Sequence, residues 1–177
     1  MTFNLQPTIK NEFVKIQPLN IDDFETLFAV ASDPLIWEQH PNKNRYQRAE
    51  FENYFKGATE SGGAFLISDS NTGQIIGSSR FYDLNELEKS ILIGYTFIAK
   101  SHWGGKYNPA LKSLMLHHAF QFVDTVFFHV GSTNIRSQKA MEKLGAVKAG
   151  QLEVAYYGEP VKNNLIYKIE KKDWINL

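Results

Sequence analysis

The segment from residue 90 to residue 130 contains a strand, a glycine loop, a helix and a second strand in succession. Residues 90–98 are rich in β-branched and aromatic side chains, and a short polar stretch with Gly104 and Gly105 follows them. The next apolar residues have helical spacing: Leu111, Met115, Ala119 and Phe122. Residues 126–130 then form a short apolar run. Since parallel strands need a long crossover connection, usually a helix, this order predicts a parallel strand pair.

The rest of the chain has the patterns of helices and antiparallel strands. Helices are expected at residues 21–31, from Ser32-Asp33-Pro34 onward, at 48–61 and at 134–144. Further strands are expected at residues 13–19, 64–68 and 75–82, and in the closing runs VAYY (154–157) and NLIYKIE (164–170). These elements predict a single α+β domain over residues 1–177, with a mixed, mostly antiparallel sheet flanked by helices.

The composition excludes several classes of function. Nineteen basic and nineteen acidic residues balance, so no global field favours nucleic acid or an anionic membrane. No stretch approaches the roughly 20 apolar residues of a membrane span, and the first residues lack the pattern of a signal peptide, so we expect a cytoplasmic protein. The absence of cysteine excludes disulfides, thiolate metal sites and an S-acyl enzyme. The five histidines have no metal-ligand spacing, so no metal is expected.

The loop SHWGGKYNPALKSLM, residues 101–115, leads into the crossover helix. Asn108 is a favoured N-cap, and Pro109 is favoured at the first helical position. Gly104 and Gly105 allow close approach of the backbone to a ligand beside the positive end of the helix, and Lys106 adds a charge. The loop is either a phosphate cradle or an ordinary connection, because neither established glycine-rich phosphate motif has this spacing.

A second polar turn, GSTNIRSQ, follows the strand at residues 126–130. Asn134 and Ser137 lie in the first turn of the helix that this segment opens, and Gly145 suits the end of that helix. Taken alone, Asn134 and Ser137 are either helix-capping residues or members of a binding site.

Read together, the segments IGYTFIAKSHWGGKYN, ALKSLMLHHAF and NIRSQKAMEKLGAVKAG resemble the GCN5-related N-acetyltransferase (GNAT) superfamily, in particular its RimJ/RimL-type branch. The resemblance covers about residues 13–170. It implies a GNAT fold in which a splayed parallel strand pair forms a cleft for acetyl-coenzyme A. It also implies direct transfer of the acetyl group to an amine.

The resemblance assigns residues to the cofactor. The six positions of the family loop (Q/R)xxGx(G/A) correspond to Trp103, Gly104, Gly105, Lys106, Tyr107 and Asn108, with Lys106 and Asn108 in the places of the motif's small residues. The strand at residues 93–98 would pair with the pantetheine arm, with Ile98 near the thioester. Asn134 would meet the pantetheine amides. A backbone N–H near Phe97 or Ile98 would stabilise the oxyanion.

The catalytic residues follow less directly from the resemblance. Met141 stands where many relatives have a tyrosine that protonates the thiolate, so the acid role passes to Ser137. Leu92 stands where relatives often have a glutamate base. Glu38 is therefore the main candidate for a base acting through water, and the alternatives are Asp83, Glu153 and His40.

The acceptor implied by the resemblance is the primary amine of a small molecule or of a protein N-terminus. Two other classes remain open: a non-catalytic acyl-coenzyme A binding module, which Leu92 and Met141 favour, and a small structural interaction domain. Exposed edge strands of such a fold can also pair between two copies, which would give a homodimer.

Overall fold

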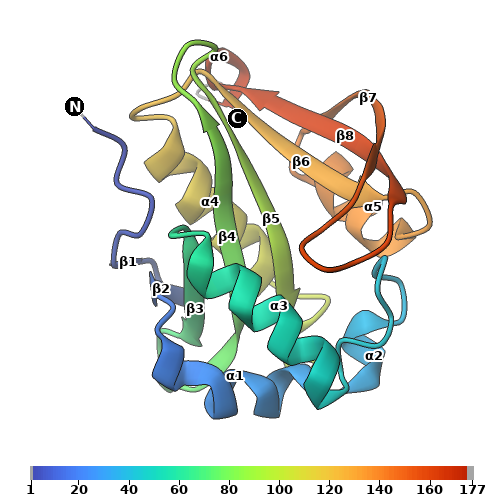
Figure 1. Cartoon of the computed structure of the whole chain (residues 1–177). Helices are drawn as coiled ribbons and strands as arrows, with labels where there is room; N and C mark the ends of the chain where they lie inside the picture. Colours follow the sequence, from blue (N-terminus) through green and yellow to red (C-terminus); the bar gives the residue numbers. More distant parts are fainter. Residues whose placement is uncertain (1, 175–177) are drawn as a thin grey trace.

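The computed structural model describes residues 2–174, so both ends of the predicted 1–177 domain lie outside the described residues. One eight-stranded sheet forms the centre of the molecule (Figure 1). Its strands, in spatial order, are β1 (Ile9–Lys10), β2 (Val14–Pro18), β3 (Ala64–Asp69), β4 (Ile75–Asn85), β5 (Ser90–Ile98), β6 (Thr125–Gly131), β8 (Lys162–Glu170) and β7 (Val147–Val154). The helices are α1 (Phe24–Ala31), α2 (Pro34–Trp37), α3 (Arg48–Glu60), α4 (Tyr107–Ala119), α5 (Ile135–Lys143) and α6 (Lys171–Trp174), with short 3-10 turns at Ile21–Asp23 and Lys100–His102.

The parallel pair predicted from the crossover is confirmed as β5 and β6. All other neighbouring strands of the described sheet are antiparallel. The parallel register contains only three pairs, from Ser90↔Thr125 to Leu92↔Phe127. Beyond them β5 continues along β4 and β6 continues along β8, so the two strands separate like the arms of a V (Figure 1). The mixed sheet with a splayed parallel pair is therefore as expected.

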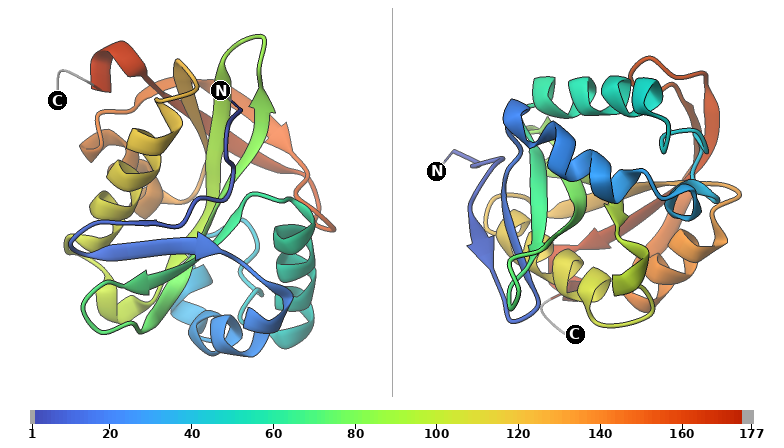
Figure 2. Two further views of the ribbon diagram at one scale, coloured as in Figure 1. Left: turned by 90° about the vertical axis from the view of Figure 1, so that its left-hand side faces the viewer. Right: turned by 90° about the horizontal axis from the view of Figure 1, so that it is seen from below.

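Two apolar clusters cover the two faces of the sheet. Helices α1 and α3 lie on one face, and α4 and α5 lie on the other (Figure 2). The larger cluster joins the α4 residues Leu111 and Met115 to the strands, and the smaller one joins Trp37 and Phe51 to Phe97 of β5. None of the helices within residues 2–174 is long and apolar enough to cross a membrane.

Helix α4 begins one residue before the predicted cap. Lys106 is the N-cap residue and already has helical dihedral angles, and its carbonyl accepts the N–H of Ala110 at 2.9 Å. The prediction that Asn108 caps the helix is therefore wrong. Pro109 is still tolerated, because the first four helical N–H groups have no partner within the helix.

The predicted strand VAYY is also displaced. Strand β7 spans Val147–Val154, so Tyr156 and Tyr157 lie in the turn that follows it. The Tyr156 hydroxyl donates to Asn164 of β8 at 2.9 Å. Pairing with β8 decided the extent of this strand, and the local aromatic pattern did not.

Gly77 of β4 offers a test of the register between β4 and β5. A Cβ added there would lie 2.0 Å from the carbonyl oxygen of Phe97, whereas one added at Gly105 would meet open space. We expect Gly77→Ala to lower the free energy of unfolding by about 2 kcal/mol or more, because backbone must move to relieve the overlap. Gly105→Ala is the matched control, with a change within about 0.5 kcal/mol. Urea unfolding measures both, and equal stabilities would contradict the register.

Candidate active site

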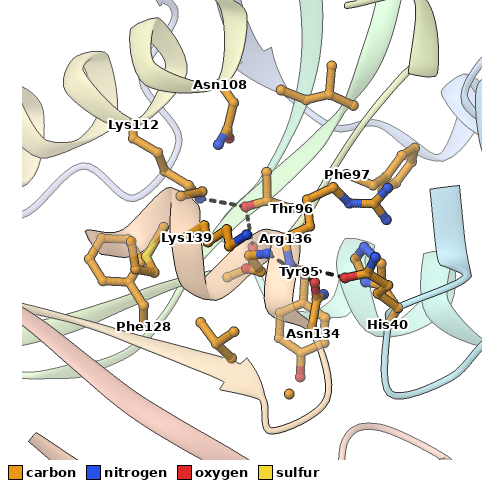
Figure 3. A pocket seen from close by; sticks show the side chains of 18 of the residues that line it. His40, Tyr95, Thr96, Phe97, Asn108, Lys112, Phe128, Asn134, Arg136 and Lys139 are labelled. Atoms are coloured by element: carbon orange, nitrogen blue, oxygen red, sulfur yellow. Dashed lines mark hydrogen bonds between the residues drawn. The ribbon is translucent and has the colours of Figure 1, made fainter. Parts of the chain in front are cut away.

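A cavity of about 670 Å³ opens where β5 and β6 separate (Figure 3). Its walls come from five parts of the chain that are distant in sequence. They are residues 93–98 of β5, residues 128–131 of β6, the loop and start of α4 (102–105, 108, 109 and 112), residues 134–137, 139–141, 143 and 144 at α5, and residues 36 and 39–41 with Arg45. Tyr82 and Tyr156 close one end. The V of the sheet is thus the origin of this concave site, which lies at the centre of the molecule.

A β-bulge shapes strand β5 at this cavity. Gly94 pairs with Arg80 and Phe97 pairs with Ser78, so Tyr95 and Thr96 together oppose the single residue Ser79. Tyr95 has a φ of 52°, which is uncommon for a residue with a side chain. The Tyr54 hydroxyl donates to the Tyr95 carbonyl at 2.7 Å and holds this conformation. The bulge bends the strand beside the site, as bulges often do near functional residues.

The predicted cofactor loop lies at the cavity, but its side chains diverge. Trp103 donates its indole N–H to the Ile98 carbonyl at 2.8 Å, and the Arg136 guanidinium lies 4.0 Å from the centre of the Trp103 ring. The loop residues that line the cavity are Trp103, Gly104, Gly105 and Asn108. The side chains of Lys106 and Tyr107 do not line it.

Lys106 and Tyr107 instead contact the strands behind the loop. The Lys106 ammonium lies 5.2 Å from the centre of the Phe13 ring, and the Tyr107 hydroxyl donates to Asp69 of β3 at 2.6 Å. Gly104 has a φ of 71°, so the loop makes a turn that favours glycine. At Lys106 and Tyr107, only the backbone N–H groups could therefore contact a ligand in the cavity.

The first turn of α5 brings Asn134 and Ser137 to the cavity. The side-chain oxygen of Asn134 accepts the backbone N–H of Ser137 at 3.0 Å, so Asn134 is the N-cap of α5. The backbone N–H of Arg136 donates to Gln39 at 3.0 Å and joins α5 to the segment after α2. Phe97 and Ile98 line the opposite wall. Asn134 therefore caps a helix and also faces the cavity, so the two roles that the sequence left open as alternatives are compatible.

None of the predicted carboxylate bases lines the cavity. Glu38, Asp83 and Glu153 are exposed, and none of them lines the cavity. Indeed, no Asp or Glu is found among the described residues of its walls. His40 does line the cavity, but burial, followed by the charges of Arg45 and Arg136, lowers its pKa to about 3. An imidazole with so low a pKa holds a proton poorly at neutral pH.

Lys112 is a cavity residue that the sequence analysis missed. Its side chain is 4% exposed, it donates to the Thr96 hydroxyl at 2.7 Å, and it lies 5.6 Å from the centre of the Phe128 ring (Figure 3). Burial lowers the pKa of Lys112 to about 7. The available signal was its position next to Leu111 and one turn after Asn108, at the edge of the apolar stripe of α4.

The chain was also compared with known proteins. The family model described as acetyltransferase (GNAT) domain matches residues 14–147. The protein belongs to the GNAT acetyltransferase family. It is accordingly an acetyl-coenzyme A-dependent acyltransferase, of a family whose general reaction is N-acetylation. None of the curated proteins compared with this GNAT chain matches it.

Solved structures share the fold of this GNAT protein at low sequence identity. A GCN5-related N-acetyltransferase from Brucella melitensis is 18% identical with a TM-score of 0.82, over 96% of this chain and 81% of that one. Mycobacterium smegmatis RimJ in complex with CoA-disulfide is 18% identical with a TM-score of 0.70, over 90% and 83%. Spermidine N-acetyltransferase from Vibrio cholerae, in complex with CoA and spermine, is 17% identical with a TM-score of 0.71, over 94% and 100%.

The two departures from family pattern occupy different places in this GNAT chain. Met141 is 3% exposed, packs in the larger apolar cluster and reaches the cavity wall. Leu92 pairs with Phe127 at the last parallel position and does not line the cavity. Neither side chain can transfer a proton, so proton transfer depends on other groups.

Replacement of Lys112 should change stability in a pH-dependent manner. Its folded pKa of about 7 lies below the ordinary lysine value of 10.5, so the unfolded chain binds more protons between these values and wild-type stability rises with pH there. Below about pH 7 Lys112 is protonated in the folded state as well, so the full cost of burying its ammonium lowers the free energy of unfolding. We therefore expect Lys112→Met to stabilise the protein, by about 2 kcal/mol more at pH 6 than at pH 9.

Urea unfolding at the two pH values measures this difference. Lys139→Met, at an exposed lysine of the same cavity, is the matched control and should show no comparable pH dependence. A stabilisation by Lys112→Met that is equal at pH 6 and pH 9 would mean that Lys112 is protonated alike in both states.

Proposed function

We propose that this GNAT protein transfers the acetyl group of acetyl-coenzyme A directly to a primary amine of a small molecule or a protein N-terminus. The carrying observation is the continuous cavity between β5 and β6, which extends from the glycine loop at α4 to a group of tyrosines at the other end. One end suits phosphates and the other suits an organic acceptor. The RimJ/RimL-type branch is supported by the loop WGGKYN and by the fold shared with RimJ.

The donor set at the loop end fits the diphosphate of coenzyme A. Gly104 and Gly105 leave open space where a side chain would stand, and the positive end of α4 lies beside them. We assign Trp103, Gly104, Gly105 and Asn108 to this end. Lys106 and Tyr107 would contribute backbone N–H groups only. Arg136, Lys139 and Lys143 of α5 supply positive charge along the same wall.

The free edge of β5 suits the pantetheine arm. Past Leu92 this edge has no partner in β6, so backbone groups between Ile93 and Ile98 can pair with the amides of an extended ligand. Asn134 faces this edge from α5, with an amide nitrogen that its capping bond leaves free to donate. A backbone N–H at Phe97 or Ile98 would stabilise the oxyanion formed during transfer.

The reaction needs one proton removed from the amine and one delivered to the thiolate. Ser137 lines the cavity beside Asn134, so we assign its hydroxyl as the donor to the thiolate. Glu38 is exposed outside the cavity, and its position does not support its role as the base. The described walls contain no carboxylate, so the amine would arrive neutral or lose its proton to water or to a nitrogen base of the walls, such as His129.

Asn134→Ser tests the cofactor site while keeping the cap, because serine is also a favoured N-cap. We expect the dissociation constant of acetyl-coenzyme A, measured by calorimetry, to rise about tenfold through loss of one amide hydrogen bond. Asn20→Ser, at a cap remote from the cavity, is the control. Unchanged affinity would remove Asn134 from the site, and no wild-type binding at millimolar cofactor would refute the proposed function.

Ser137→Ala tests the proposed acid. Thiol release is first followed across a panel of amines and peptides, to find one that turns over above hydrolysis. For that amine, we expect kcat to fall about 100-fold while cofactor affinity stays within about twofold, because general acid catalysis is lost and binding is not.

Ser132→Ala provides the matched control, since Ser132 lies before α5 and does not line the cavity. An unchanged kcat in Ser137→Ala would exclude its hydroxyl as the acid. If acetyl-coenzyme A binds but no amine turns over, the protein is instead the non-catalytic binding module.

A further inference from the structure

Three tyrosines form the end of the cavity opposite the glycine loop. The rings of Tyr82 and Tyr95 lie 5.1 Å apart, and those of Tyr95 and Tyr156 lie 5.2 Å apart, with edge-to-face geometry in both pairs. We call Tyr82, Tyr95 and Tyr156 the tyrosine chamber. All three line the cavity, together with Arg45 and His129. On the proposed function, this chamber receives the acceptor.

The charges around the chamber do not balance. Arg45 is 3% exposed and forms a buried ion pair with Glu159 at 2.7 Å, so these two charges offset each other. Arg80 is 5% exposed, and its guanidinium lies 3.9 Å from the centre of the Tyr95 ring. No carboxylate of the described chain lies within ion-pair distance of Arg80. Asp83 is exposed outside the walls and acts on Tyr82, Tyr95 and His129 through its charge, without an ion pair to Arg80. The Arg80 charge therefore remains buried behind the chamber without an ion-pair partner.

Two buried nitrogens beside the tyrosine chamber also lack hydrogen-bond partners. Within residues 2–174, only two buried side-chain nitrogens or oxygens lack a hydrogen-bond partner: Arg80 Nε and His129 Nδ1. Arg80 lies against Tyr95, and the His129 ring lies 6.4 Å from the Tyr82 ring. Arg80 Nε is always a donor, and His129 Nδ1 is a donor in one tautomer. Of the two, only His129 lines the cavity, so its Nδ1 can meet a ligand directly, whereas Arg80 lies behind the Tyr95 ring and acts on a ligand through its charge.

Burying an unpaired charge costs several kcal/mol, and arginine does not release its proton to avoid this cost. A protein can retain a buried unpaired charge at a substrate site if the bound substrate supplies the opposite charge. Because the Arg80 guanidinium is buried behind the Tyr95 ring, solvent screens its charge less than that of an exposed arginine, and it attracts an anionic group in the chamber. The hydroxyl groups of the three tyrosines stay protonated, because burial raises the pKa of each.

We propose that the acceptor is an amine that carries a carboxylate a few bonds away, and that Arg80 determines this specificity. A polyamine is disfavoured, because it would bring further ammonium groups to a chamber that has excess positive charge and walls without Asp or Glu among the described residues. Two sources share the selected chemistry: a free amino acid, and a peptide whose N-terminal residue is acidic.

The test measures kcat/KM per unprotonated amine for pairs that differ by one carboxylate, because an amide lowers the pKa of the neighbouring amine. The pairs are L-alanine with L-alaninamide, and a peptide beginning with Glu with the same peptide beginning with Gln; spermidine is assayed alone. We expect the carboxylate member of at least one pair to be favoured about tenfold or more. The pair that shows the preference identifies the source. Equal rates within both pairs, or spermidine as the best acceptor, would overturn the proposal.

Variants of Arg80 test its assignment. Arg80→Met removes a buried unpaired charge and is expected to fold at least as well as the wild type. It should reduce the preference for the carboxylate member to about twofold or less, whereas Arg80→Lys, which keeps a positive charge, should retain most of it. A preference that survives in Arg80→Met would exclude Arg80 as its origin.

Calorimetry with acetyl-coenzyme A separates this inference from the proposed function. The wild type and both Arg80 variants should bind the cofactor alike, because Arg80 lies outside the cofactor walls. Failure of the wild type to bind it would refute the proposed function. Normal binding with turnover of amides or polyamines would refute only the acceptor class.

Discussion

The separation of β5 from β6 after three residue pairs is the constraint on which the rest of the molecule depends. Each strand keeps an antiparallel partner on its outer side, so the sheet remains continuous in backbone pairing while its centre opens. An interior strand edge without a partner would ordinarily leave polar backbone groups unsatisfied. Here that edge faces a cavity, and the bulge at Tyr95 and Thr96 bends β5 further beside it. The cavity is thus a consequence of how the sheet is paired.

The sequence predicted those features that depend on short-range patterns. The crossover around α4, the helix after Asn134 and the hairpin of β3 and β4 follow from periodicity, turn residues and caps. The assignment of acetyl-coenzyme A to the glycine loop came from the resemblance, since the loop spacing alone left phosphate binding open. Of the residues so assigned, Asn134 and Ser137 line the cavity, whereas Glu38 does not.

The features that were missed arise from contacts between distant segments. Lys112 reaches Thr96 of β5 across the interior, and nothing within one turn of α4 shows that its ammonium is buried. The tyrosine chamber joins Tyr82, Tyr95 and Tyr156 from three separate parts of the chain, so it exists only once the registers of β4, β5 and the turn after β7 are set. The net charge of the whole sequence is zero, so it could not show that the described cavity walls lack acidic residues.

The loop after β5 is anchored on both sides: Trp103 bonds to the Ile98 carbonyl, and Tyr107 bonds to Asp69 of β3. A segment that is already ordered loses little conformational entropy when a ligand arrives. Cofactor entry and departure in this protein would then not await a loop rearrangement. The residence time of the cofactor would be set by the strength of its contacts with the protein. Successive cofactor molecules would exchange through a cavity mouth whose shape does not change.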